Sequence, residues 1–242
     1  MNEEIWPTRL FNDYLAGLGN LLRSWFQQPL SERPWSTFIV MQLLVVATII
    51  VLFAILKPRL SVDKPGKLQQ IFEVIYDFVH GQADDMVGHD APKHTTLFGT
   101  FFVFILLCNL IGIIPGFQSP TQFVYVPAGC AVVAFLYYNF VGVRKNGVLQ
   151  YLRHFAGPIW WVSPLMFVIE IISHLARPLS LTIRLFANMF AGEQVTLVFL
   201  SLTYFIIPAL FMGLHVFVSL LQAYIFMLLT MMYVGGAVAE EH

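Results

Sequence analysis

EIISHLARPLSLTIRLFANMFAGE, residues Glu170 to Glu193, is the stretch that decides the fold of this chain. Most of its side chains are those of Ile, Leu, Ala, Met and Phe, which suit a membrane. Polar side chains nevertheless recur at steps of three or four residues, and such steps form one stripe on a helix. The stripe comprises Glu170, Ser173, Arg177, Ser180, Arg184 and Asn188. A charge inside a bilayer costs at least about 2.5–3.5 kcal/mol and usually faces a cavity, a partner or a water path. The stretch therefore predicts a functional membrane helix.

The composition of the whole chain is that of an integral membrane protein. Of its 242 residues, 58% are hydrophobic and 11% are charged, whereas soluble domains carry about 25% charged residues. A net charge of −1 argues against a nucleic-acid partner. The first residues are acidic where a signal peptide is basic, so we expect no leader of that kind. Cys108 and Cys130 lie in apolar runs and are expected to be core residues, not a disulfide or a metal site.

Three apolar segments are predicted to span the membrane, within a peripheral unit of residues 36–158. Residues 36–56 contain no charge and are long enough to cross a bilayer. Residues 96–114 form the second span and residues 123–141 the third. Asn109 is the strongly polar side chain of the second span, and we expect it to hydrogen-bond between helices.

Two amphipathic segments accompany the first span. Residues 1–35 place leucines and aromatic residues at helical spacing, which predicts a helix on the membrane surface; a mobile arm is the alternative. Residues 67–87 carry a one-sided apolar stripe and are interpreted as a second interfacial helix, with a docking site for a partner helix as the alternative. Basic residues gather between the first two spans and after the third. The positive-inside rule therefore puts 67–87 in the cytoplasm, and loop 115–122 and the N-terminus outside.

Residues 159–242 are predicted to form a hairpin of two long, strongly tilted helices. The apolar character runs for nearly 80 residues, although two perpendicular spans need only about 40. A helix over 163–192 would be about 45 Å long, against a hydrocarbon core of about 30 Å. We expect the turn between about 193 and 212, with Pro208 and Gly213 as candidate break points. The fold class is thus all-α, with three spans, interfacial helices and this hairpin.

Arg184 is the side chain with the sharpest functional interpretation. A guanidinium stays charged even where lysine loses its proton, so it attracts a carboxylate but does not relay protons. The alternative is a structural ion pair with Glu170 or Glu193. Those residues lie about 21 Å and about 14 Å away along one helix, so Arg184 is expected to face something outside its own segment and to act as a gate.

The two carboxylates lie on opposite sides of Arg184, as two offset half-channels would require. Glu170 lies toward the cytoplasmic entry of the helix, and Glu193 lies at its other end. The second helix of the hairpin, about 210–236, carries a polar stripe of its own, formed by His215, Ser219 and Gln222. Histidine suits a proton shuttle because its reference pKa is about 6.5. Asn188 and Gln222 are expected to line this path, with a hydrogen-bonded packing cluster as the alternative. Glu170 and His174 suggest a metal pair only faintly, since no third ligand follows.

These segments resemble subunit a of the F-type ATP synthase, the proton-channel subunit of the membrane sector. The likeness is carried by RPLSLTIRLFANMFAGE and LLQAYIFMLLTMMYVGGAVAEEH, with support from KPGKLQQIFEVIYDF, NLIGIIPG and GVRKNGVLQYLRHFAGP. It covers about residues 60–242. The resemblance implies a multi-pass protein of the bacterial inner membrane. It also implies contacts with a c-subunit ring, the b subunits of the peripheral stalk, other ATP synthase subunits and the lipid bilayer.

The resemblance also assigns roles residue by residue. Arg184 matches the essential arginine that separates two half-channels leading to and from carboxylates on the rotating c-ring. Glu193, His215, Asn188 and Gln222 match the non-cytoplasmic path, and Glu170, Ser173 and Arg177 match the cytoplasmic one. It implies no cofactor, no metal and no catalysis by this subunit itself. After Pro120-Thr121, where the family usually has Asp or Asn, this chain reads QFVYVP. The outer mouth is therefore expected to be lined by Gln118, Gln122 and Tyr125.

Three other functions remain as alternatives. A stand-alone proton- or ion-coupled transporter would use the same buried charges without a ring partner, although no internal repeat is visible. A membrane hydrolase would need a metal-ligand set, and none is apparent. A structural scaffold would have no need of Arg184 between two acids.

Overall fold

The computed structural model describes residues 5–25, 27, 29–114, 116–147, 163–202 and 206–238, and these contain helices and connecting segments but no strand. The α-helices are α1 (Trp6–Trp25), α2 (Thr37–Leu56), α3 (Lys67–Val87), α4 (Ala91–Ile111), α5 (Tyr125–Asn146), α7 (Ser163–Leu202) and α8 (Ile206–Val238). Three short 3₁₀ turns join them: η1 (Lys57–Arg59), η2 (Gly88–Asp90) and η3 (Pro120–Gln122).

The protein is an all-α membrane protein, as the sequence predicts. Five helical segments are long and apolar enough to cross a bilayer, matching three spans and two hairpin helices. The second of them is longer than predicted, at 45 residues over Lys67–Ile111, because η2 joins α3 to α4 without a break. The amphipathic segment predicted over 67–87 has the bounds of α3. The second span starts earlier than predicted, at Ala91, because Pro92 is tolerated in the first helical turn.

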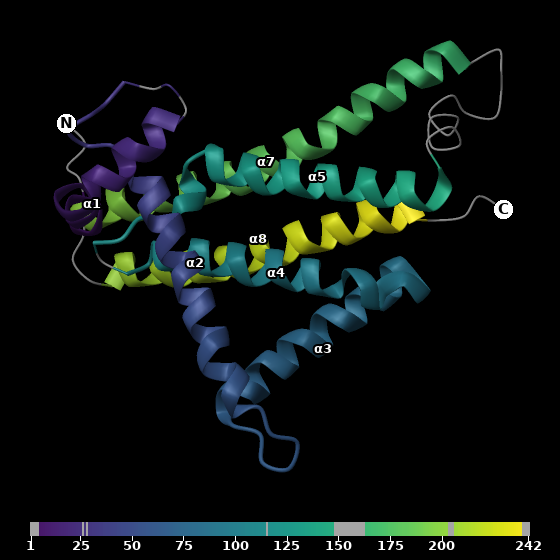
Figure 1. The fold of residues 1–242 in the computed structure, drawn as a ribbon, viewed down its shortest axis with the longest axis horizontal. Helices are drawn as coiled ribbons and strands as arrows, with labels where there is room; N and C mark the ends of the chain where they lie inside the picture. The colour runs from purple at the N-terminus through teal and green to yellow at the C-terminus, as the bar shows by residue number, and fades with distance from the viewer. Residues whose placement is uncertain are drawn as a thin grey trace.

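Four helices run roughly alongside one another, and a fifth crosses them. In Figure 1, α4, α5, α7 and α8 share one general direction, whereas α2 crosses them steeply and α3 returns from the lower end of α2. Helix α8 packs against α3, α4, α5 and α7, so it forms the centre of the bundle. The largest completely buried side chains of this core are Tyr138, Phe98, Ile105, Leu185, Met189, Met227, Met231 and Val234.

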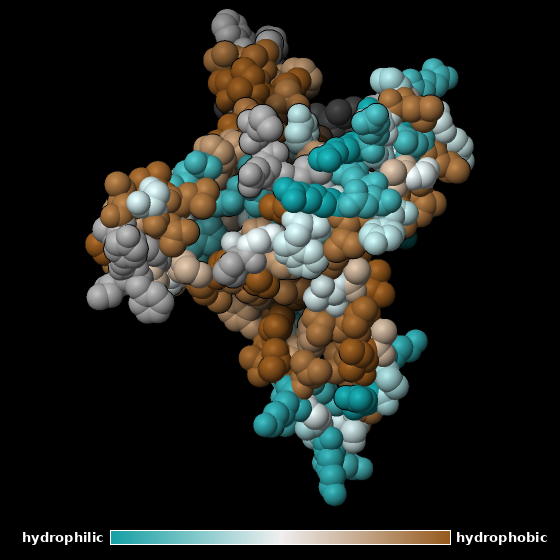
Figure 2. Space-filling view, turned by 90° about the vertical axis from the view of Figure 1, so that its left-hand side faces the viewer, coloured by the Kyte–Doolittle hydropathy of each residue, from teal (hydrophilic) through white to brown (hydrophobic). Residues whose placement is uncertain are grey.

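The outer limb of the molecule has the surface of a lipid-facing element. Figure 2 shows hydrophobic residues covering the lower limb and hydrophilic residues at its tip. This limb contains α2, whose candidate span Thr37–Arg59 has a mean hydropathy of 3.0 and is only 22% buried within the protein. An apolar helix that few neighbours cover needs hydrocarbon around it, because exposing such a surface to water is unfavourable.

The C-terminal hairpin is longer than the sequence analysis expected. Helix α7 has 40 residues and α8 has 33, whereas about 20 residues span a bilayer, so both must tilt strongly. Helix α7 ends at Leu202 and α8 begins at Ile206, both inside the interval predicted for the turn, and residues 203–205 lie outside the described residues. The prediction of a break at Pro208 or Gly213 is wrong, because both lie inside α8. Pro208 is accommodated because the first turn of a helix does not use its backbone N–H groups for internal hydrogen bonds.

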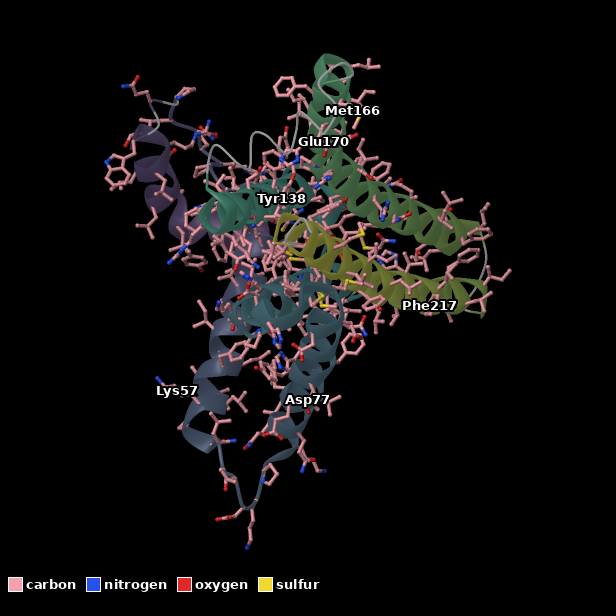
Figure 3. The ribbon with its side chains drawn as sticks, turned by 90° about the vertical axis from the view of Figure 1, so that its right-hand side faces the viewer. Lys57, Asp77, Tyr138, Met166, Glu170 and Phe217 are labelled. Atoms are coloured by element: carbon pink, nitrogen blue, oxygen red, sulfur yellow. The ribbon has the colours of Figure 1, made fainter. Side chains whose placement is uncertain are left out.

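Two details of α7 follow from its length. The prediction that Glu193 lies at the end of the helix is wrong, because α7 continues for nine residues beyond it. Pro178 lies inside α7, and a proline there removes a backbone hydrogen bond and bends the helix. Figure 3 shows α7 changing direction beyond the end that carries Met166 and Glu170.

One glycine sets how closely the centre of the bundle approaches α3. A Cβ built on Gly235 of α8 would collide with the backbone carbonyl of Met86 at the end of α3. The adjacent Gly236 has open space around the same position. The two residues therefore form a matched pair, of which only Gly235 is required for packing.

We expect Gly235→Ala to destabilise the protein by about 1–3 kcal/mol, because overpacking against a backbone atom forces helices apart. Gly236→Ala should be neutral or stabilising by up to about 1 kcal/mol, since alanine favours a helix. Thermal unfolding of the two purified variants in detergent measures this difference. Equal midpoints for both variants would contradict the packing described here.

Candidate functional site

Arg184 lies on an exposed position of α7, beside the contact between α7 and α8. Leu181 and Leu185 on the same helix are buried, whereas Arg184 and Ile183 are exposed. A small hollow of about 10 Å³ lies beside Arg184 and is lined by Gln222, Phe226 and Leu229 of α8, among others. That volume is comparable to the space needed for one water molecule. Within the described part of the chain, no salt bridge or hydrogen bond to Arg184 is recorded.

On one side of Arg184, His215 of α8 lies against α7 at Gly192, the residue before Glu193. The His215 side chain is buried and its ring lies against Gly192. A Cβ on Gly192 would lie 2.7 Å from His215 Nδ1, so glycine is needed for this approach. Because Gly192 precedes Glu193 directly, the ring of His215 lies next to the part of α7 that carries this carboxylate.

Gln122 reaches Glu193 from η3. Its side chain is buried and lies within hydrogen-bonding reach of the Glu193 carboxyl. Neither Glu193 Oε2 nor Gln122 Nε2, both buried, has a hydrogen bond of regular geometry within the described residues. The other two residues expected at this mouth are placed differently: Gln118 is half-buried, and Tyr125 is 68% exposed and stacks on Phe38.

A buried polar network fixes η3 against α4 and α8. Asn109 donates a hydrogen bond from Nδ2 to the Ser219 carbonyl at 3.1 Å and accepts one at Oδ1 from Thr121 Oγ1 at 2.6 Å. Ser119 Oγ is 2.6 Å from Thr121 Oγ1 and donates to the Cys108 carbonyl. All four polar residues are completely buried. The expectation that Asn109 hydrogen-bonds between helices is confirmed.

The cluster on the other side of Arg184 contains the second arginine of the stripe. Arg177 Nη2 lies 3.7 Å from Glu170 Oε1, and its Cζ lies 5.3 Å from the ring centre of Tyr233 and 5.9 Å from that of Tyr138. Both distances are in the range of cation–π contacts. Figure 3 labels Glu170 and Tyr138 on the neighbouring helices α7 and α5. Arg177 therefore has partners inside the protein, which Arg184 lacks in the described part.

His174 belongs to this second cluster as a structural residue. Its Nε2 lies 2.8 Å from Asn139 Oδ1 and 3.2 Å from the Tyr138 hydroxyl. The described residues contain no group of three or more His, Cys, Asp or Glu side chains that could hold a metal. The faint suggestion of a metal pair with Glu170 thus finds no third ligand in the described residues.

The remaining site residues lie on the same helices but make fewer contacts. Ser173 is exposed, and Asn188 is half-buried one turn beyond Arg184. Gln222 is buried beside Arg184 in the small hollow, so it lies closer to the arginine than the sequence analysis expected. Sequence reasoning missed Gly192, Tyr138 and Tyr233. Only Gly192 had a signal, as a glycine inside a helix directly before the membrane carboxylate.

Comparisons with known proteins agree on one family. The family model described as ATP synthase A chain matches residues 39–235. A protein named ATP synthase subunit a from Solibacter usitatus (strain Ellin6076) is 64% identical over 233 residues, covering 96% of this chain and 100% of the relative. The protein of that name from Koribacter versatilis (strain Ellin345) is 48% identical over 244 residues and covers 100% of both chains. A third, from Trichlorobacter lovleyi, is 43% identical over 198 residues, or 81% of this chain and 86% of its own.

We expect Asn109→Leu to lower the free energy of unfolding by about 1–2 kcal/mol, because the Thr121 hydroxyl and the Ser219 carbonyl each lose a buried partner. Thr100→Val on the same helix is the control, since Thr100 is exposed and bonds only to its own helix. Unfolding of both variants in detergent measures the effect. An Asn109→Leu variant as stable as the control would show that the network contributes little.

Proposed function

This chain belongs to the ATP synthase subunit a family, and from that premise we propose that it is the stationary, non-catalytic proton-channel subunit of the enzyme's membrane sector. It is a multi-pass protein of the bacterial inner membrane and takes part in ATP synthesis and proton transport. In the proposed mechanism, two offset half-channels pass protons to and from carboxylates of a rotating c-ring. Arg184 separates the two half-channels.

The environment of Arg184 is the observation that carries this proposal. Its guanidinium is exposed on a membrane helix and has no recorded counter-charge within the described residues. A permanent charge in a bilayer needs a partner, a cavity or water, so a carboxylate on another subunit would satisfy it. Arg177 does not have this need, because Glu170 and two tyrosine rings already surround it. The two arginines of the stripe are therefore given different roles.

The cluster around Glu193 would form the non-cytoplasmic half-channel. Glu193 and His215 are two groups that can exchange protons, and the contact of the His215 ring with Gly192, next to Glu193, supports a path that includes both. A proton reaching this pair would pass toward Arg184 by way of Asn188, which lies between them on α7. Gln222, buried beside Arg184, offers an amide at the inner end of the path.

The cluster around Glu170 would form the cytoplasmic half-channel. Glu170 and Ser173 lie toward the start of α7, about 21 Å and about 17 Å from Arg184 along the helix. Arg177 lies between them and Arg184, and its positive charge would help a proton leave the ring carboxylate by favouring the ionised form. Because Pro178 bends α7 between the two clusters, the two half-channels would run in different directions.

The coupling between proton flow and rotation depends on Arg184 blocking a direct path. A proton that crossed without turning the ring would dissipate about 2.3 kcal/mol per 100 mV of membrane potential. A guanidinium suits this task because it keeps its charge in an apolar site, whereas a lysine can lose its proton there. The b subunits of the peripheral stalk would hold this subunit still while the ring turns.

The experiment that tests the proposal is cross-linking to a co-expressed c subunit. Ile183 is 52% exposed next to Arg184, whereas Leu181 is 3% exposed, so Ile183→Cys is the test and Leu181→Cys its matched control. Both native cysteines are buried and should not compete. We expect a disulfide from position 183, but not from 181, to a cysteine beside the membrane carboxylate of the c subunit. An intact complex with no link at 183 would favour a stand-alone transporter instead.

We expect Arg184→Ala and Arg184→Lys each to reduce ATP-driven proton pumping by about tenfold or more. The lysine variant is the sharper test because it keeps a basic group but not a permanent charge. Pumping is measured as acidification of membrane vesicles containing the whole enzyme. Pumping by the lysine variant at the wild-type rate would refute the proposed gate.

We expect Gly192→Ala to lower proton flux by about tenfold, since a displacement of about 1 Å at a reacting group can cost about 100-fold. The added methyl group would meet His215 Nδ1 and push the ring away from Glu193. Gly213→Ala on α8 is the control, because no atom lies within 4 Å of its added Cβ. Similar flux in both variants would show that the Gly192–His215 contact is not needed for transport.

A further inference from the structure

Two buried polar atoms without partners meet at one place in the membrane. Glu193 Oε2 and Gln122 Nε2 are both shielded from solvent, and neither has a hydrogen bond of regular geometry among the described residues. They come from different elements, α7 and η3, which pack against each other. Leaving either atom unpaired in a low-dielectric environment is costly, so their common location calls for an explanation.

The two atoms are chemically complementary. The amide nitrogen of glutamine only donates hydrogen bonds, and an ionised carboxylate oxygen only accepts them. A hydrogen bond to a charged acceptor is about twice as strong as one between neutral groups. The Gln122 side chain lies within hydrogen-bonding reach of the Glu193 carboxyl, so the two groups are placed to form such a bond.

The backbone under Gln122 is held firmly in place. Gln122 ends the turn η3, whose three residues are all buried. Its two polar predecessors, Ser119 and Thr121, are tied to α4 by hydrogen bonds to the Cys108 carbonyl and to Asn109. A side chain carried by such an anchored turn loses little freedom when it binds, which is what a positioning residue requires.

Resting on the proposed function, we propose that Gln122 is a positioning residue of the non-cytoplasmic half-channel. Its amide donates a hydrogen bond to the Glu193 carboxylate each time Glu193 has passed its proton on. This bond stabilises the ionised form and keeps the carboxylate oriented while His215 lies on the Gly192 side of the cluster. The amide carries no charge and does not itself take up the proton. The loop after Pro120 thus contributes a neutral donor to the channel in this chain.

The first test replaces Gln122 in the complete enzyme. Gln122→Leu keeps much of the side-chain volume but removes the donor, and Gln194→Leu on α7 is the matched control because Gln194 is exposed next to Glu193. The readout is passive proton flux through the membrane sector in vesicles stripped of the catalytic part. We expect Gln122→Leu to lower the flux about tenfold and the control to leave it near wild type. Wild-type flux in Gln122→Leu would overturn the proposal.

The second test exchanges the two groups. If Gln122 had only a structural role, this exchange would not restore conduction. The double variant Gln122→Glu with Glu193→Gln restores an amide–carboxylate pair in reverse order. We expect it to conduct at least about threefold better than Glu193→Gln alone. The pair Gln194→Glu with Glu193→Gln should give no such rescue, because Gln194 faces away. Equal flux in the exchange and in the single Glu193 variant would also overturn the proposal, even if Gln122→Leu assembled poorly.

Arg184→Lys, measured in vesicles that contain the whole enzyme, distinguishes a failure of this inference from a failure of the proposed function. Coupled pumping by Arg184→Lys at the wild-type rate would refute the gate and, with it, the premise of the proposal. Loss of pumping in Arg184→Lys together with unchanged flux in Gln122→Leu would refute only the role of Gln122.

Discussion

A permanent positive charge in an apolar helix, with no counter-charge among the described residues, is the constraint on which the rest of this structure depends. Arg184 is exposed on the hairpin, whereas Leu181 and Leu185 of the same helix are buried. Arg177 differs, because Glu170 and two tyrosine rings lie near its guanidinium. In the proposed mechanism, the charge of Arg184 is satisfied by another subunit.

The surrounding architecture serves to hold the hairpin rigidly around this charge. Helix α8 lies at the centre of the bundle and contacts α3, α4, α5 and α7. Close approach is possible where side chains are absent: Gly235 admits the backbone of α3, and Gly192 admits the ring of His215. Hydrogen bonds also fix how these elements are oriented. Asn109 of α4 bonds to Thr121 of η3 and to the Ser219 carbonyl of α8, in an environment where unpaired polar atoms are costly.

In the proposed mechanism this rigidity has a functional purpose. A channel that hands protons to a moving ring needs its donors and acceptors in fixed positions, because misplacement of a reacting group by about 1 Å can cost about 100-fold in rate. The non-cytoplasmic cluster draws its members from α7, α8 and η3, three elements that the network around Asn109 and the glycine contacts hold together. The cytoplasmic cluster draws on α5, α7 and α8 in the same way, through Tyr138, Arg177 and Tyr233.

The sequence by itself determined the fold class, the helical segments and the polar stripe of α7, because hydrophobic periodicity and length are local properties. It also predicted residues 67–87 as a helix to the residue and pointed to Arg184 as the unpaired charge. It failed on Pro208 and Gly213, since a proline in a first turn and a glycine in a lipid environment need not break a helix. Only the tertiary structure decided which side chains meet: that Gln122, and not Gln118 or Tyr125, reaches Glu193; that His215 rests on Gly192; and that two tyrosines enclose Arg177. These contacts join residues from helices far apart in the chain, and their geometry depends on how closely the helices pack, which no local pattern encodes.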